Sequence, residues 1–176
     1  ELVRQNIIAN LLNSPLKELQ ARLSLVAPVQ KIDGFDISNI SGQLAVGSCV
    51  RFNKGKSDKK MYRKFKIKTV VGSDDFAMIK EVVGRRYKNK QWSKPDLILI
   101  DGGKGQLSMA KLALEELKIK IPVISIAKRE EEIFVVGQSM PIIFDKNSQA
   151  LKLLQRVRDE AHRFAVTYHK KLRKIK

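Results

Sequence analysis

A carboxylate follows a short apolar run in the second half of the chain. The run is Leu97-Ile98-Leu99-Ile100, and it is followed by Asp101 and the glycine-rich turn Gly102-Gly103-Lys104-Gly105-Gln106. Four apolar residues bounded by turn signals predict a strand buried on both faces, and ligands in open α/β sheets bind at the carboxyl ends of such strands. Asp101 is therefore a candidate for chemistry, although an aspartate in this position can equally serve as a helix N-cap.

A second carboxylate, Asp36, lies within a predicted strand. It belongs to the segment Gly34-Phe35-Asp36-Ile37-Ser38, in which Phe35 and Ile37 point to the opposite face. An ionised carboxylate away from a strand end is costly to bury unless a cation or hydrogen-bond donors meet it. A bound metal ion would offset that cost. The alternative is that the Asp36 carboxylate accepts hydrogen bonds from backbone amides or pairs with an arginine. If the two strands are neighbours, Asp36 and Asp101 converge on one site.

The predicted last helix offers a third candidate, His162, in the segment Arg158-Asp159-Glu160-Ala161-His162-Arg163-Phe164. His162 borders the apolar face of this helix, so the alternative is that it is an ordinary boundary residue that makes one hydrogen bond. Two carboxylates and one imidazole suit Mg²⁺ or Mn²⁺, and the sequence leaves open whether His162 binds metal or carries a proton. Asp159 has three open roles: it can orient the imidazole, act as a further ligand, or pair with Arg163. We expect His169 to lie on the surface.

Positive residues near these candidates suit a phosphate backbone. Alternation along a strand predicted over residues 60–68 puts Lys64, Lys66 and Lys68 on one face. A solvated, lysine-rich edge that discourages aggregation is the alternative. The turn that opens the helix after Asp101 adds Lys104 and Gln106 as candidates for holding a phosphate, and Arg158 is a further candidate for binding DNA. The turn is not a nucleotide P-loop, because the pattern Gly-x-x-x-x-Gly-Lys-Ser/Thr is absent.

Composition favours a polyanionic partner. The 176 residues include 35 Lys and Arg against 18 Asp and Glu, which gives a formal charge of +17. Aromatic residues make up only 6%, so contact with a phosphate backbone is favoured over base stacking. The single cysteine, Cys49, excludes an internal disulfide and a multi-cysteine zinc site and indicates the cytoplasm. No apolar run approaches the ~20 residues of a membrane span, so we expect no membrane partner.

The elements that would position these residues form an α/β domain behind a helical connector. The connector covers residues 1–25, with its second helix starting at Ser14-Pro15, and the domain covers residues 26–176. The domain is predicted to contain strands 31–39, 44–53 and 60–68, helix 74–87, strand 96–100, helix 104–117, strand 121–126, a hairpin over 132–144 and helix 148–172. This order resembles the ribonuclease H fold, a mixed five-stranded sheet flanked by helices.

Four motifs, in order, resemble one family. They are Gly34 to Ser38, Tyr62 to Lys68, Leu97 to Gln106 and Arg158 to Ala165. Together they are similar to the C-terminal endonuclease domain of the UvrC subunit of the bacterial excinuclease, and the resemblance extends over nearly the whole chain. It implies an RNase H-like fold, Mg²⁺ or Mn²⁺ as cofactor, and Asp36, Asp101 and His162 as the catalytic set. Asn39 stands where the family usually has histidine.

The same resemblance implies a biological role. The expected activity is hydrolysis of a phosphodiester 5′ to a lesion in nucleotide excision repair, on damaged double-stranded DNA and together with UvrB in the excinuclease. Two other classes remain open. A non-catalytic basic nucleic-acid-binding module explains the charge but not Asp36, and a nucleotide-binding α/β protein explains Asp101-Gly102-Gly103 but not the basic strand.

Overall fold

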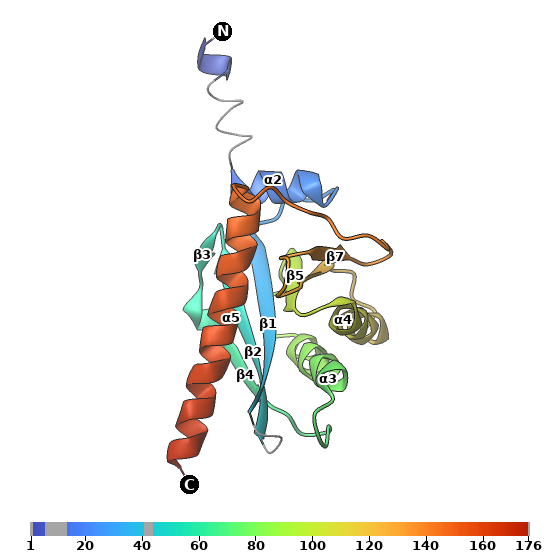
Figure 1. Ribbon diagram of the computed structural model, residues 1–176, viewed down its shortest axis with the longest axis vertical. Coiled ribbons are helices and arrows are strands. Elements are labelled where there is room, and N and C mark those ends of the chain that lie inside the picture. Colours follow the sequence, from blue (N-terminus) through green and yellow to red (C-terminus); the bar gives the residue numbers. More distant parts are fainter. Residues whose placement is uncertain (1, 6–13, 41–43, 176) are drawn as a thin grey trace.

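Seven strands form one mixed sheet within residues 2–5, 14–40 and 44–175, which are the residues that this computed structural model describes (Figure 1). The strands are β1 (Lys31–Ile40), β2 (Leu44–Asn53), β3 (Lys56–Ser57), β4 (Arg63–Lys66), β5 (Leu97–Asp101), β6 (Val123–Ile126) and β7 (Ile133–Val135). Their spatial order is β3-β2-β1-β5-β6-β7, and β4 also pairs with β2. The central strand β1 is antiparallel to β2 and parallel to β5.

Helices cover both faces of the sheet. They are α2 (Pro15–Arg22), α3 (Asp75–Lys88), α4 (Lys104–Glu116) and α5 (Gln149–Lys174), with a 3₁₀ turn, η1 (Lys59–Met61). The long helix α5 packs on β1 and β2 on one face, while α3 and α4 pack against each other on the other face (Figure 1). The sheet therefore separates two hydrophobic cores.

Strand β5 belongs to both cores, as its unbroken apolar run predicts. Leu97 and Leu99 pack in the core under α5, whereas Ile98 and Ile100 pack in the core under α3 and α4. All four side chains are at most 1% exposed. Burial on both faces leaves Asp101 as the first polar residue of the strand, at the edge where a ligand can reach it.

The predicted elements are found, with differences at their ends. The sheet has seven strands where five were predicted. The two-residue β3 is too short to show a pattern of alternation, and β7, the first arm of the predicted hairpin, joins the sheet by pairing with β6. The strand predicted over residues 60–68 is limited to β4, since η1 occupies residues 59–61. The second arm of the predicted hairpin forms only a bridge between Ile133 and Ile142, next to Pro141, which has no amide hydrogen to donate.

The predicted connector is partly packed on the rest of the chain. Leu19 of α2 is fully buried in the core under α5, and the Glu18 carboxylate accepts hydrogen bonds from the Ser148 hydroxyl (2.5 Å) and the Ala150 amide (3.0 Å). Most of the first predicted connector helix falls in residues 6–13, outside the described residues. The domain boundary at residue 25 stays a prediction. In the described part of the chain, every helix is too short or too polar to cross a membrane.

Candidate active site and metal centre

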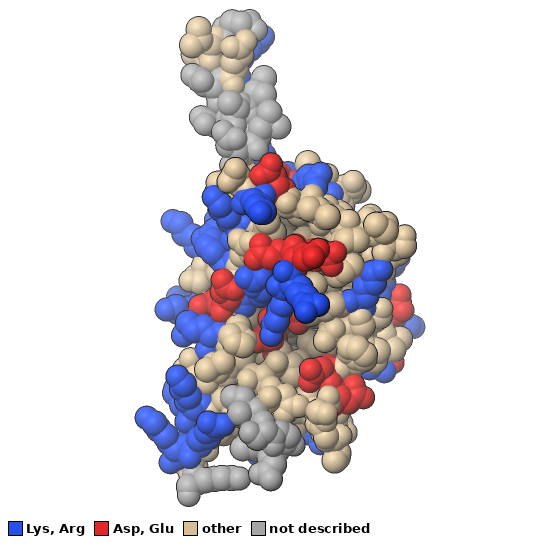
Figure 2. Space-filling model, viewed as in Figure 1, with Lys and Arg blue, Asp and Glu red and all other residues tan. Residues whose placement is uncertain are grey.

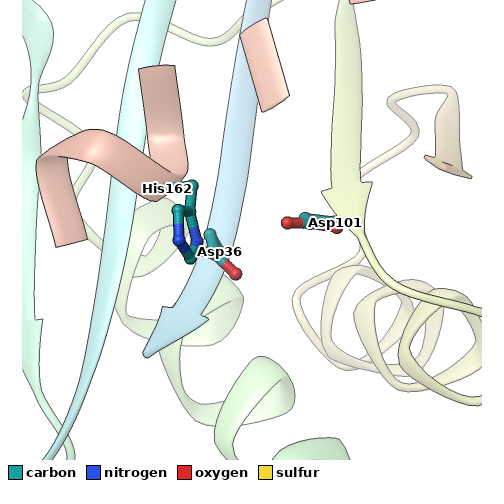
Figure 3. Close-up of side chains that lie close together, drawn as sticks. All are labelled: Asp36, Asp101 and His162. Carbon is teal, nitrogen blue, oxygen red and sulfur yellow. The ribbon is translucent and has the colours of Figure 1, made fainter. Parts of the chain in front are cut away.

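Three predicted site residues come together at one point of the fold (Figure 3). Asp36 comes from β1, Asp101 from the end of β5 and His162 from α5. Each offers one ligand atom, and these atoms all lie within 4.8 Å of one another. The Nδ1 atom of His162 is 2.9 Å from Oδ2 of Asp36. Residues far apart in the sequence thus form one cluster with the composition of a divalent-metal site.

Strand pairing places the two carboxylates side by side. The parallel register pairs Phe35 of β1 with Ile100 of β5, so the next residues along these strands are Asp36 and Asp101. Phe35 packs in the core under α3 and α4. Because successive strand residues point to opposite faces, Asp36 points to the face that α5 covers.

Two contacts hold α5 close above Asp36. A Cβ atom on Gly34 would lie only 2.5 Å from Cγ1 of Val157, so glycine is required for the helix to approach β1 this closely. The Ser48 hydroxyl, on the residue paired with Asp36 in the sheet, donates a 2.7 Å hydrogen bond to the Ala161 carbonyl. This bond anchors the helix one residue before His162. Sequence reasoning missed Ser48, although a polar residue in a buried strand is a usable signal.

The electrostatics of the site disfavour two ionised carboxylates without a cation. Burial raises the pKa of Asp36, and the nearby His162 only partly offsets this effect. Burial, followed by the charge of Asp36, raises the pKa of Asp101 to about 6. Oδ1 of Asp101 is buried and has no hydrogen-bond partner among the residues that the structure describes. A divalent cation would satisfy this oxygen and neutralise both carboxylates, so the donor set fits such an ion.

Two cavities open onto the carboxylates, and Lys128, which sequence reasoning missed, lines both. The first, of about 270 Å³, is lined by Asp36, Ile37, Asp75, Ile79, Asp101, Gly102, Gly103, Gln106, Ala127 and Lys128. The second, of about 390 Å³, is lined by Asp101, Lys128, Glu131, Arg158, Asp159 and His162. Lys128 lies in the loop after β6, where neither periodicity nor a motif marks it.

The predicted phosphate contacts near Asp101 have other partners in the fold. The Lys104 ammonium donates to the Ser139 carbonyl (2.5 Å) and lies 5.4 Å from the centre of the Phe134 ring. The Gln106 side chain lines the first cavity, but its oxygen accepts a hydrogen bond from the Gly103 amide (3.1 Å) and so caps α4. Contacts of Lys104 and Gln106 with DNA stay predictions.

Asp159 and Arg163, which flank His162 on α5, do not form the ion pair with each other that was one of the expected roles of Asp159. Asp159 bonds Arg158, with a shortest distance of 2.9 Å, rather than Arg163, which forms its ion pair with Glu160 at 2.6 Å. Arg158 also faces Glu131 at 3.5 Å and lines the second cavity. The prediction that His169 lies on the surface was wrong.

The His169 side chain is only 2% exposed. It lies four residues after Ala165, so both residues share the buried face of the helix. The helical spacing from Ala165 therefore indicated that His169 is buried, although histidine is a polar residue and is more often found at the surface.

The predicted basic face is present beside α5. Lys64 and Lys66 are exposed on β4 while Phe65 between them is buried, and Lys68 is exposed just beyond the strand. The Lys64 ammonium lies about 5 Å from the ring centres of Phe164 and Tyr168, which ties this face to the helix. Lys and Arg side chains gather over the C-terminal half of α5 in Figure 2. Burial and the charge of Lys171 lower the pKa of Lys64, so an anion would relieve repulsion here.

Comparison with known proteins relates the chain to one family. The family model described as "UvrC RNAse H endonuclease domain" matches residues 20–166. UvrABC system protein C of Methanosarcina acetivorans is 53% identical over 161 residues, which make up 90% of this chain and 31% of that protein. UvrABC system protein C of Dehalococcoides mccartyi is 50% identical over 187 residues, covering 98% of this chain and 31% of that protein. The chain thus spans about a third of the length of these relatives.

A solved structure shares the fold at low sequence identity. Endonuclease V of Ciona intestinalis, in complex with a 24mer DNA containing an inosine followed by a ribo-adenosine, matches with a TM-score of 0.53 and 15% identity, over 98% of this chain and 100% of that chain. At this identity the match shows the fold alone. The RNase H-like fold that the order of elements predicted is confirmed.

Proposed function

Because the chain belongs to the UvrC RNase H endonuclease domain family, we propose that it is a divalent-metal-dependent endodeoxyribonuclease that hydrolyses a phosphodiester bond. The convergence of Asp36, Asp101 and His162 carries this proposal, since their ligand atoms lie within 4.8 Å of one another. Oδ1 of Asp101 is buried and has no hydrogen-bond partner in the described part of the chain, which supports a cation rather than a purely structural carboxylate. A basic nucleic-acid-binding module without catalytic activity would not need two carboxylates and an imidazole clustered in this way.

In the proposed mechanism Asp36 and Asp101 would hold the cation, Mg²⁺ or Mn²⁺. When bound, the cation activates water and neutralises charge on the phosphate. His162 stands beside Asp36 and acts either as a further ligand or as the group that carries a proton. Ser48 fixes the distance between the helix and Asp36 through its bond to the Ala161 carbonyl.

The proposed substrate is damaged double-stranded DNA, cut 5′ to the lesion in nucleotide excision repair. The net charge of +17 and the basic face beside α5 support a DNA partner. UvrB is the proposed protein partner, as in the UvrABC system after which the relatives are named. The proposed compartment is the cytoplasm, in keeping with the buried, free thiol of Cys49.

Nicking of supercoiled plasmid tests the proposed activity. We expect this chain to convert plasmid to the nicked form with Mn²⁺ or Mg²⁺ and not with EDTA, because the carboxylates need the cation to act on a phosphodiester. Plasmid shifted on a gel without nicking under all conditions would favour the non-catalytic binding module. Nicking that persists in EDTA would contradict metal dependence.

The basic face beside α5 predicts a specific salt dependence of DNA binding. Replacing Lys64, Lys66 and Lys68 together with Ala should lower the slope of log K against log salt by up to ~2.7, at about 0.9 per phosphate contact. Fluorescence anisotropy of a labelled duplex at several salt concentrations measures the slope, with and without a lesion. We expect little preference for the lesion, because phosphate contacts carry no information about the bases.

A second triple variant controls for net charge. Lys90, Lys94 and Lys120 are exposed in the loops that lead into β5 and β6, at the edge of the sheet opposite Asp101. Replacing these three with Ala removes the same charge, and we expect a clearly smaller change in slope. Equal slopes for the two triple variants would show that DNA binding does not use the face beside α5.

A further inference from the structure

Lys128 stands beside both carboxylates without belonging to the predicted metal-ligand set. Strand β6 ends at Ile126, which pairs with Asp101 of β5, and Lys128 follows two residues later. Its side chain lines the cavity that contains Asp36 and Asp101 and also the cavity that contains Asp101 and His162. Its positive charge acts on both carboxylates, whose pKa values it lowers against the effect of burial. Lys128 is therefore placed where a bound phosphate would meet the site.

The other cations near the carboxylates are already engaged. The Lys104 ammonium bonds the Ser139 carbonyl, and the Arg158 guanidinium bonds Asp159 and faces Glu131. Lys128 is exposed and forms no hydrogen bond or ion pair with the parts of the chain that the structure describes. An exposed ammonium loses little on meeting a phosphate, because no internal partner has to be given up.

We propose that Lys128 binds a nonbridging oxygen of the phosphate that is cut and stabilises the negative charge that develops there during hydrolysis. This inference rests on the proposed nuclease function. In the reaction a water oxygen bonds to phosphorus, the bond to the leaving deoxyribose oxygen breaks, and a proton from the water ends on that leaving oxygen. Lys128 donates a hydrogen bond and a positive charge throughout and transfers no proton.

The two functions that a lysine can have here differ in what its removal does to the cleavage rate. Lys128 repels a divalent cation, so removing its charge should tighten binding of that cation to Asp36 and Asp101. If Lys128 served only as a counter-ion of the carboxylates, its removal would leave the rate with bound metal unchanged. A phosphate-binding role predicts slower cleavage together with the tighter metal binding.

The experiment measures three quantities on the same variants. Lys128→Ala is compared with the unchanged chain for Mn²⁺ affinity by calorimetry, duplex affinity by anisotropy, and the single-turnover nicking rate at saturating Mn²⁺ and DNA. We expect Mn²⁺ to bind about two- to tenfold more tightly, duplex affinity to stay within about threefold, and the rate to fall by about 10²-fold or more. Lys128→Arg should recover part of the rate, because it restores a charged donor.

Arg129→Ala is the matched control. Arg129 is the next residue, is exposed and lines neither cavity, so its removal should leave the rate and the Mn²⁺ affinity unchanged. An unchanged rate for Lys128→Ala, or weaker Mn²⁺ binding by it, overturns the inference while leaving the nuclease function standing. If the unchanged chain does not nick at all, the proposed function fails and this inference falls with it. Thermal unfolding of each variant checks that the fold is retained.

Discussion

Replacing Asp101 with Asn is expected to abolish metal-dependent nicking and, at the same time, to make the metal-free chain more stable. The amide keeps the shape of the side chain but removes the negative charge that holds a divalent cation. Losing several kcal/mol of transition-state stabilisation lowers the rate by about 10³-fold or more. We expect the same loss of nicking for Asp36→Asn, because both carboxylates face one cation site.

The expected gain in stability follows from the raised pKa of Asp101. This pKa is raised from 3.8 to about 6, so the fold binds the proton more tightly than the unfolded chain does. The contribution of this proton to stability is complete below pH ~4, and it is lost as the pH rises through about 6. Above that pH the charged carboxylate costs the metal-free fold about 1–3 kcal/mol, at ~1.4 kcal/mol per pKa unit. Asparagine removes this cost.

Thermal unfolding in EDTA at pH 5 and pH 7.5 measures this effect. The midpoint of the unchanged chain should fall between these two pH values and rise again when Mn²⁺ binds the folded state. The midpoint of Asp101→Asn should be higher at pH 7.5 in EDTA and should not respond to Mn²⁺. Asp145→Asn, at an exposed carboxylate that lines neither cavity, is the control and should behave as the unchanged chain does.

The gains from the two carboxylates are not additive. Removing the charge of Asp36 also relieves Asp101, because that charge is one cause of the raised pKa of Asp101. The double variant should therefore gain less stability than the sum of the two single variants. A midpoint for Asp101→Asn that still rises with Mn²⁺ would show that the cation binds elsewhere.

The candidates that sequence identified best are those with strong local patterns. Asp101 follows a short apolar run that is typical of a doubly buried strand, and Asp36 interrupts a strand whose neighbours are apolar. Once β1 pairs with β5, the register brings these two residues together without further information. His162 depended on the resemblance to a family, because a histidine at the border of an apolar helix face is ordinary by itself.

The site residues and contacts that the sequence did not predict depend on contacts between elements that lie far apart in the chain. Lys128 lies in an irregular loop, and only the pairing of β6 with β5 brings it to Asp101. The bond from Ser48 to the Ala161 carbonyl joins a strand and a helix 113 positions apart. Lys104 was expected at the phosphate because its turn opens a helix, but its long side chain reaches the Ser139 carbonyl instead. Local sequence patterns predict the secondary structure of the backbone, but they do not predict which group a long, flexible side chain will contact.

The second large effect is expected at His162. His162→Ala should lower the single-turnover nicking rate by about 10²-fold or more, within the usual range for a group that moves a proton in the transition state. The imidazole is about half exposed, at 55%, whereas Asp36 beside it is 5% exposed, so its removal leaves no cavity in the core. The fold should therefore be retained, and thermal unfolding checks this. His169 is unsuitable as the control histidine, because its side chain is buried.

His162→Asn separates chemistry from positioning. The asparagine amide can donate a hydrogen bond to Oδ2 of Asp36, in place of the 2.9 Å contact that Nδ1 of the imidazole makes, but it cannot carry a proton at neutral pH. If the imidazole takes part in the reaction, His162→Asn and His162→Ala should lose nicking to the same extent. If its contribution is to orient Asp36, the asparagine variant should keep most of the activity. We expect equal losses, because Asp36 is already held by a central strand that pairs on both sides, and such a strand needs no exposed side chain to fix its position.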